Sequence, residues 1–224
     1  MNEKINKFSA VTDLLIFSVV FWGIWSLRFF GVAFIGALTM GAGIVLVIVL
    51  QRWRKQTLTD IGIRKAESSR WLVARAGLAV AYIAITLLLV GGLASFLLGG
   101  PSESAAITQQ PTGFWLFLLD ATLVTWVLIG FGEEFVFRGF ILNRLLVLTG
   151  ESSRGLVFAS LLQAIWFGAG HASQGLTGML MTGAVGFVLA LAFLTRMKRN
   201  LWPLVIAHAG IDTVALTVAW VGNQ

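Results

Sequence analysis

The sequence predicts an all-α membrane protein, a polytopic bundle of about seven transmembrane helices. Of its 224 residues, 58% are hydrophobic and only 12% are charged. A water-soluble domain of this length has too little interior to bury so much apolar surface. The apolar residues also recur in runs of about 20, the length that an α-helix needs to cross the hydrocarbon core of a bilayer.

Seven such runs are predicted to span the membrane, and together they predict a single integral membrane domain over residues 1–224. The mixed segment 51–71 is expected to be a loop with an interfacial helical turn. The connection 99–113 is rich in Gly, Ser and Gln, with Glu103 as its only charge. The short loops are typical of a bacterial inner-membrane protein. The predicted spans cover residues 11–27, 31–50, 74–98, 113–132, 155–171, 177–195 and 202–221.

The basic residues predict the orientation, because Lys and Arg concentrate on the cytoplasmic side of membrane proteins. With the N-terminus, which carries Lys4 and Lys7, placed in the cytoplasm, Arg28 is the only basic residue on the other side. The net charge of +6 is therefore a topology signal, and no nucleic-acid partner is expected. The residues expected on the cytoplasmic side, counting Arg75 and Arg138 as helix ends, are Arg52, Arg54, Lys55, Arg64, Lys65, Arg70, Arg144, Arg154, Arg196, Lys198 and Arg199.

A cluster of charged residues follows the fourth run. Charges inside a bilayer are costly, so they are retained where they pair, line a polar cavity or take part in chemistry. In a helix, Glu134 and Arg138 lie one turn apart and can form an ion pair, whereas Glu133 points about 100° away. Glu133 is then free to face a cavity as a general base. The alternative is a structural cluster in which both glutamates pair with Arg138 and Arg144 at the cytoplasmic interface.

The only two histidines lie on two further spans. His171 ends the fifth run, four residues after Phe167, and His208 precedes Asp212 by four residues. Small residues beside both histidines allow the helices to approach closely, so that these groups can converge. With the predicted boundaries, however, Glu133 lies near the inner end of its span and His171 toward the outer side. Convergence therefore requires shifted boundaries, or a bent or tilted helix.

These groups are sufficient to activate water. Glu133 supplies a base, and the imidazoles of His171 and His208 can donate hydrogen bonds to an oxyanion. Asp212 can orient His208. The same four side chains could instead hold zinc with a bound water, so the site is expected to need either no cofactor or zinc. No H-E-x-x-H helix supports the metal, and water activated directly by glutamate is the preferred hypothesis.

Two further acids lie within predicted spans. Asp13 is expected near the inner end of the first span, where it reaches the interface, and Asp120 is expected to hydrogen-bond a neighbour in the fourth. The alternative for Asp120 is a proton or ion path through Glu133 and His171, as in a small transporter. No inverted repeat supports that alternative.

Three short motifs follow one another on the fourth, fifth and seventh spans. In this order they resemble the CPBP family of intramembrane proteases, the CAAX protease and bacteriocin-processing or Abi family. The resemblance covers about residues 113–221. The motifs are E-E-x-x-x-R at Glu133, Glu134 and Arg138, F-x-x-x-H at Phe167 and His171, and H-x-x-x-[N/D] at His208 and Asp212.

This resemblance implies an intramembrane endopeptidase, glutamate-dependent or metal-dependent, that cleaves a membrane peptide or the tail of a lipidated, CAAX-like protein. It also implies that Glu133 is the base and that His171 assists the water. Glu134 and Arg138 would support the site. His208 and Asp212 would contribute to the oxyanion site, although CAAX-processing members usually carry Asn at the second position. A non-catalytic immunity or scaffold protein is the alternative within the family.

Overall fold

The protein is a bundle of helices, as the sequence predicts. The computed structural model describes residues 5–31, 34–99 and 113–222, and no strand occurs in these ranges. Lys4 and most of the predicted connection 99–113, including Glu103, lie outside the described residues. Six of the described helices are long and apolar enough to cross a membrane. The prediction of an all-α polytopic bundle is confirmed, and the protein is an integral membrane protein.

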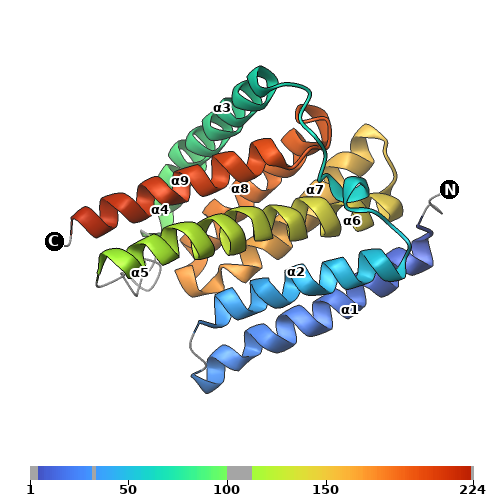
Figure 1. The fold of residues 1–224 in the computed structure, drawn as a ribbon, viewed down its shortest axis with the longest axis horizontal. Helices are drawn as coiled ribbons and strands as arrows, with labels where there is room; N and C mark the ends of the chain where they lie inside the picture. Colours follow the sequence, from blue (N-terminus) through green and yellow to red (C-terminus); the bar gives the residue numbers. More distant parts are fainter. Residues whose placement is uncertain (1–4, 32–33, 100–112, 223–224) are drawn as a thin grey trace.

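The helices follow the seven predicted runs in chain order (Figure 1). Three of the short elements are single 3-10 turns (η1, η2 and η7), and three segments are π-helical (η3, η5 and η6). The elements are α1 Lys7–Ser26, η1 Leu27–Phe30, α2 Ile35–Trp53, η2 Leu58–Ile61, α3 Ser69–Thr86, η3 Leu87–Gly91, α4 Gly92–Leu98, α5 Phe114–Leu119, η5 Asp120–Phe131, η6 Glu134–Ile141, α6 Leu142–Thr149, α7 Ser153–Gly170, η7 Ala172–Gln174, α8 Gly175–Thr195 and α9 Trp202–Val221.

The fourth helix is much longer than predicted. From α5 to α6 it is continuous over Phe114–Thr149 and contains 36 residues, whereas the sequence predicted an end at residue 132. The apolar run stops at Glu133, but the chain continues as helix because η6 is buried inside the bundle along its whole length. Glu133 therefore lies in the middle of a helix, and its predicted place near the inner end of a span is wrong.

This long helix crosses the middle of the bundle, with α9 on one side of η5 and α2 on the other (Figure 1). Its η6 segment forms the centre of the core, where Val136 and Phe140 are fully buried. The helix also approaches α9 very closely. A Cβ atom added to Gly130 would lie 2.6 Å from the Cβ of Ala209. Only glycine permits this approach, which brings α9 against the helix that carries Glu133.

The hairpin of α6 and α7 sets the position of the fifth span. Gly150 follows α6 with a φ of 79°, a conformation that favours glycine. Ser152 then caps α7, since its side chain accepts a hydrogen bond from the backbone N–H of Gly155 at 3.1 Å. α7 consequently runs back along the long helix and ends beside its middle, where His171 follows the last turn.

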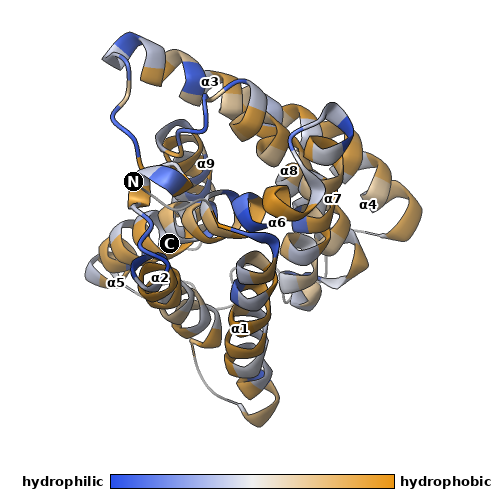
Figure 2. Ribbon diagram, turned by 90° about the vertical axis from the view of Figure 1, so that its right-hand side faces the viewer, coloured by the Kyte–Doolittle hydropathy of each residue, from blue (hydrophilic) through white to orange (hydrophobic). Residues whose placement is uncertain are grey.

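The outer surface of the bundle is apolar along the helices (Figure 2). Phe96 of α4 and Trp115 of α5 are 85% and 77% exposed, and similar side chains project from most of the other helices. The connection between α2 and α3 is hydrophilic, and it contains the helical turn η2 that was expected in 51–71. Such a surface suits the hydrocarbon of a bilayer between two polar ends.

A buried ionic cluster joins α1, α2 and α6. Asp13 is fully buried, and its two carboxylate oxygens lie 2.8 Å from Arg54 and 3.0 Å from Arg144. Arg144 also donates to the amide oxygen of Gln51. Arg144 thus pairs with Asp13 and not with the glutamates, which contradicts the alternative of one structural cluster of Glu133, Glu134, Arg138 and Arg144. The expected places of Asp13 and Arg144 relative to the membrane stay predictions.

Asp13→Asn is expected to lower the free energy of unfolding by about 3–5 kcal/mol, because the buried Arg144 loses its counter-ion. Denaturation of the detergent-solubilised protein measures this change. Glu67→Gln is the matched control, since it removes the exposed pair of Glu67 with Lys198 and should cost about 1 kcal/mol or less. Equal losses in both variants would show that the buried cluster does not hold the three helices together.

Candidate active site

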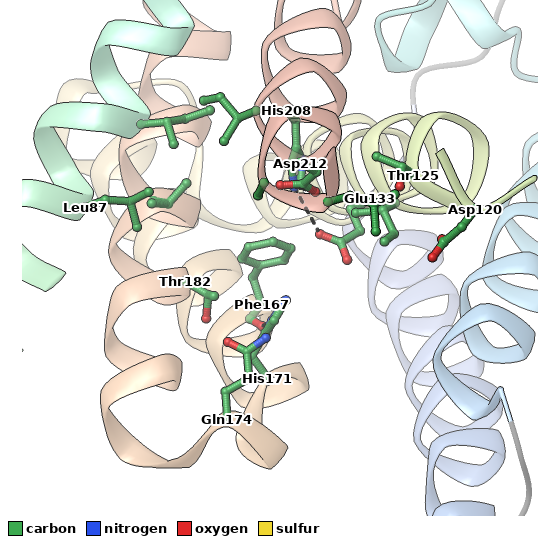
Figure 3. A pocket seen from close by; sticks show the side chains of 16 residues that line it. Leu87, Asp120, Thr125, Glu133, Phe167, His171, Gln174, Thr182, His208 and Asp212 are labelled. Carbon is green, nitrogen blue, oxygen red and sulfur yellow. Dashed lines mark hydrogen bonds and ion pairs between the residues drawn. The ribbon is translucent and has the colours of Figure 1, made fainter. Parts of the chain in front are cut away.

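The predicted site residues from three helices line one cavity. This cavity has a volume of about 410 Å³ and lies among η5, α7, α8 and α9 (Figure 3). Glu133, His171, His208 and Asp212 all contribute to its wall. They meet because the long helix carries Glu133 through the middle of the bundle, which removes the difference in depth that the predicted boundaries implied.

Behind the cavity, Glu134 and Arg138 form the ion pair expected from their spacing. An oxygen of Glu134 lies 3.1 Å from Nη1 of Arg138, and both side chains are fully buried. The same oxygen, Oε1, lies 2.9 Å from Nδ1 of His208. Because a carboxylate only accepts, this nitrogen of His208 donates the hydrogen bond. The bond between Glu134 and His208 was not predicted, since nothing in the sequence shows which side chains meet across two helices.

Glu133 points away from this ion pair and into the cavity. It makes no hydrogen bond to a described residue, and its side chain is 14% exposed. Its Oε2 lies 3.9 Å from Nε2 of His208, the nitrogen that Glu134 does not hold. The same Nε2 lies 3.5 Å from a carboxylate oxygen of Asp212. His208 is thus fixed on one side and faces two carboxylates on the other.

His171 enters the cavity from the opposite wall. Its Nδ1 lies 2.8 Å from the backbone oxygen of Phe167 and donates to it, because a carbonyl only accepts. This leaves Nε2 of a neutral imidazole as an acceptor. The ring of Phe167 packs against His171 with centroids 4.8 Å apart, and the guanidinium of Arg138 lies 4.5 Å from the same ring. Phe167 therefore connects the buried ion pair to His171.

A second cavity, of about 260 Å³, adjoins the first and shares several lining residues with it. It is lined mainly by apolar side chains of α1, α2 and η5, such as Phe21 and Met40. Glu133, His171 and Gln174 line both cavities. A peptide that extended from one cavity into the other would therefore pass Glu133. Gln174 was not predicted, because it lies in the short turn η7 after the fifth span and belongs to no motif.

Asp120 lies in the wall of the first cavity, where it forms no hydrogen bond or ion pair with any residue that the structure describes. The expectation that it hydrogen-bonds a neighbour is therefore wrong. Thr125, also on η5, lines the same cavity and was not singled out in the sequence. A lone threonine in an apolar run gives no signal of its own.

The donor set does not form a metal site. Within the described ranges, no group of three or more His, Asp or Glu side chains is arranged to hold a metal ion. Both histidines use Nδ1 in hydrogen bonds within the protein, which leaves Nε2 of each ring toward the cavity. Glu133, His171, His208 and Asp212, the ligands of the zinc alternative, are not grouped around one point among the described residues, and no step proposed below passes through a metal.

A family model covers the part of the chain that builds this site. Residues 114–214 match the Rce1-like type II CAAX prenyl endopeptidases, and the match includes all three motifs. No curated protein and no solved structure matches the chain. The matched residues run from α5 into α9, the same part of the chain that resembles the CPBP proteases. Over this part, the chain is therefore similar to the Rce1-like CAAX endopeptidases, in agreement with its resemblance to the CPBP family.

Proposed function

We propose that the protein hydrolyses a peptide bond in a membrane-associated or lipidated, CAAX-like substrate, with water activated by Glu133. One observation carries this proposal. Glu133 is a carboxylate without a hydrogen bond to a described residue, it lies where two cavities meet, and imidazoles of two other helices line the same space. We also propose that the N-terminus lies in the cytoplasm and that the membrane is a bacterial inner membrane.

In this mechanism, water binds between Glu133 and His171. Glu133 takes a proton from the water, and Nε2 of His171 accepts its second hydrogen bond, which aims the oxygen at the peptide carbonyl. Attack gives a tetrahedral intermediate whose oxyanion is bound by Nε2–H of His208, which is an imidazolium in this mechanism because its Nδ1–H also donates to Glu134. Glu133 then gives its proton to the leaving amine, and the C–N bond breaks. The base is thus regenerated in each turnover.

The other polar groups hold this arrangement in place. Glu134 holds Nδ1 of His208, and Arg138 compensates the charge of Glu134 within the core. Asp212 is a carboxylate and cannot donate a hydrogen bond to an oxyanion. At 3.5 Å from Nε2, it instead orients the His208 ring from the cavity side. This role fits the departure from Asn at that position.

Glu133→Gln is expected to lower peptide cleavage by at least about 100-fold, because an amide cannot take the proton from water. Its melting temperature should stay close to that of the parent, since Glu133 makes no hydrogen bond to a described residue. Quenched-fluorescent peptides, free and lipid-tailed, provide the assay with purified protein in detergent. Cleavage at the parent rate by this variant would contradict the mechanism.

The same assay with a chelator tests the metal hypothesis. We expect an unchanged rate, because the described donor set does not group around an ion. Loss of activity on chelation, with recovery on added zinc, would instead assign His171, His208 and Asp212 as ligands. Thr122→Val is a suitable control for effects of purification on activity, since Thr122 is exposed and its hydroxyl bonds only within its own helix.

Arg138→Met is expected to lower the free energy of unfolding by about 3–5 kcal/mol, because Glu134 stays charged in the core without its partner. The double variant Glu134→Gln with Arg138→Met removes both charges and should recover part of that loss. Denaturation in detergent compares the two proteins. If the double variant were less stable than the single one, the uncompensated charge of Glu134 would not explain the loss of stability in Arg138→Met.

A further inference from the structure

Asp120 is a carboxylate within a membrane span that the mechanism does not use. It is the first residue of η5 and lines the catalytic cavity. Asp13, another acid of the membrane spans, is compensated by two arginines, whereas Asp120 has neither a hydrogen bond nor an ion pair within the described part of the chain. Charged groups persist at bilayer depth where they pair or serve a function. Asp120 lacks the structural explanation that Asp13 has.

A second polar group beside Asp120 also lacks a partner. Thr125 is 3% exposed and lines the same cavity. The helical threonines Thr122, Thr182 and Thr213 donate to the carbonyl four residues before them. The hydroxyl of Thr125 makes no such bond. A buried hydroxyl that forgoes this bond is available to a group inside the cavity.

The π-helical geometry of η5 places both groups on the wall that holds Glu133 (Figure 3). In an α-helix, with its 3.6 residues per turn, Asp120 and Glu133 would lie about 140° apart around the axis. A π-helix bonds residue i to i+5 and therefore has more residues per turn than an α-helix. Asp120, Thr125, Ile129 and Glu133 follow one another at spacings of five, four and four, and all four line the cavity. One wall of the cavity thus carries a polar group at each end.

The charge of this cavity is negative. Its lining includes the carboxylates of Asp120, Glu133 and Asp212 but no Lys or Arg, among the residues that the structure describes. In the second cavity Glu133 is the only acid of the described lining. A free carboxylate and a hydroxyl oxygen are together satisfied by a cationic N–H donor, either an ammonium or a guanidinium group.

We propose that Asp120, with Thr125, binds a cationic group of the substrate and so selects the peptides that Glu133 cleaves. The group is a Lys or Arg side chain, or a free N-terminal amine. This proposal rests on the proposed function. At about 1.5 Å per helical residue, Asp120 lies at most roughly 20 Å along the helix from Glu133. An extended peptide covers that length with about six residues, so the positive charge lies within about six residues of the cleaved bond.

Binding to the Glu133→Gln protein tests this without turnover. Fluorescent apolar peptides carry one Lys at successive positions, and each is compared with the same peptide carrying norleucine there. Peptides with a free or an acetylated N-terminus separate the α-amine from the side chain. We expect Lys to tighten binding about tenfold at a subset of positions, as a charge-assisted hydrogen bond would. Tighter binding of the free than of the acetylated peptide supports the proposal with the α-amine as the cation, provided that Asp120→Asn removes the difference.

Adding Asp120→Asn should reduce the preference for Lys to about twofold or less, and Thr125→Val should reduce it by a smaller factor. Adding Thr122→Val, a change on the exposed side of the same helix, should leave it intact. The proposal would be overturned if neither Lys at any position nor a free N-terminus tightened binding, or if the preference survived Asp120→Asn. Failure of the parent to cleave any peptide would count against the proposed function alone, because these affinities are measured on an inactive protein.

Discussion

The site depends on one buried ion pair, that of Glu134 with Arg138. Glu134 extends the pair to α9 through its hydrogen bond with His208, and Arg138 extends it to α7 through the ring of Phe167, which packs on His171. Three helices that are distant in sequence are thus held around one pair of charges. Burying either charge without the other would be strongly destabilising, so the packing of the three helices depends on this pair.

The uninterrupted central helix is the second constraint. A break near residue 132 would have left Glu133 at a membrane surface, where water screens a carboxylate and competes for its contacts. Because the helix continues through η6, the base sits in the interior, between one cavity with two additional carboxylates and another with mainly apolar walls. The protein thereby keeps a small polar chamber inside an apolar bundle. The aromatic side chains of Phe135 and Phe137 are buried beside it.

The sequence predicted the helices well, but it predicted few of the side-chain contacts between different helices. Apolar runs predicted the helices, and spacing within a helix predicted the pair of Glu134 and Arg138. The predicted end of the fourth helix was wrong because a hydropathy pattern assigns charged residues to solvent. Arg144, however, is buried in the bundle and pairs there with Asp13. The bond from Glu134 to His208 and the shared wall of Asp120 and Glu133 depend on tertiary packing and on a π-helical register. No sequence pattern indicates either of these two features.

The contact of Gly130 with Ala209 has a consequence for the dimensions of the site. Ala209 adjoins His208, and Gly130 lies three residues before Glu133, so the missing side chain at Gly130 sets how far apart base and imidazole stand. At this contact the backbone of Gly130 packs directly against Ala209 of α9. A side chain added there could be accommodated only in part, because packed protein interiors relax little. The distance between Glu133 and His208 therefore depends on Gly130, a residue that takes no part in the proposed reaction. Because Gly130 has no side chain that could rotate away, a larger distance between Glu133 and His208 requires α9 itself to lie farther from the long helix.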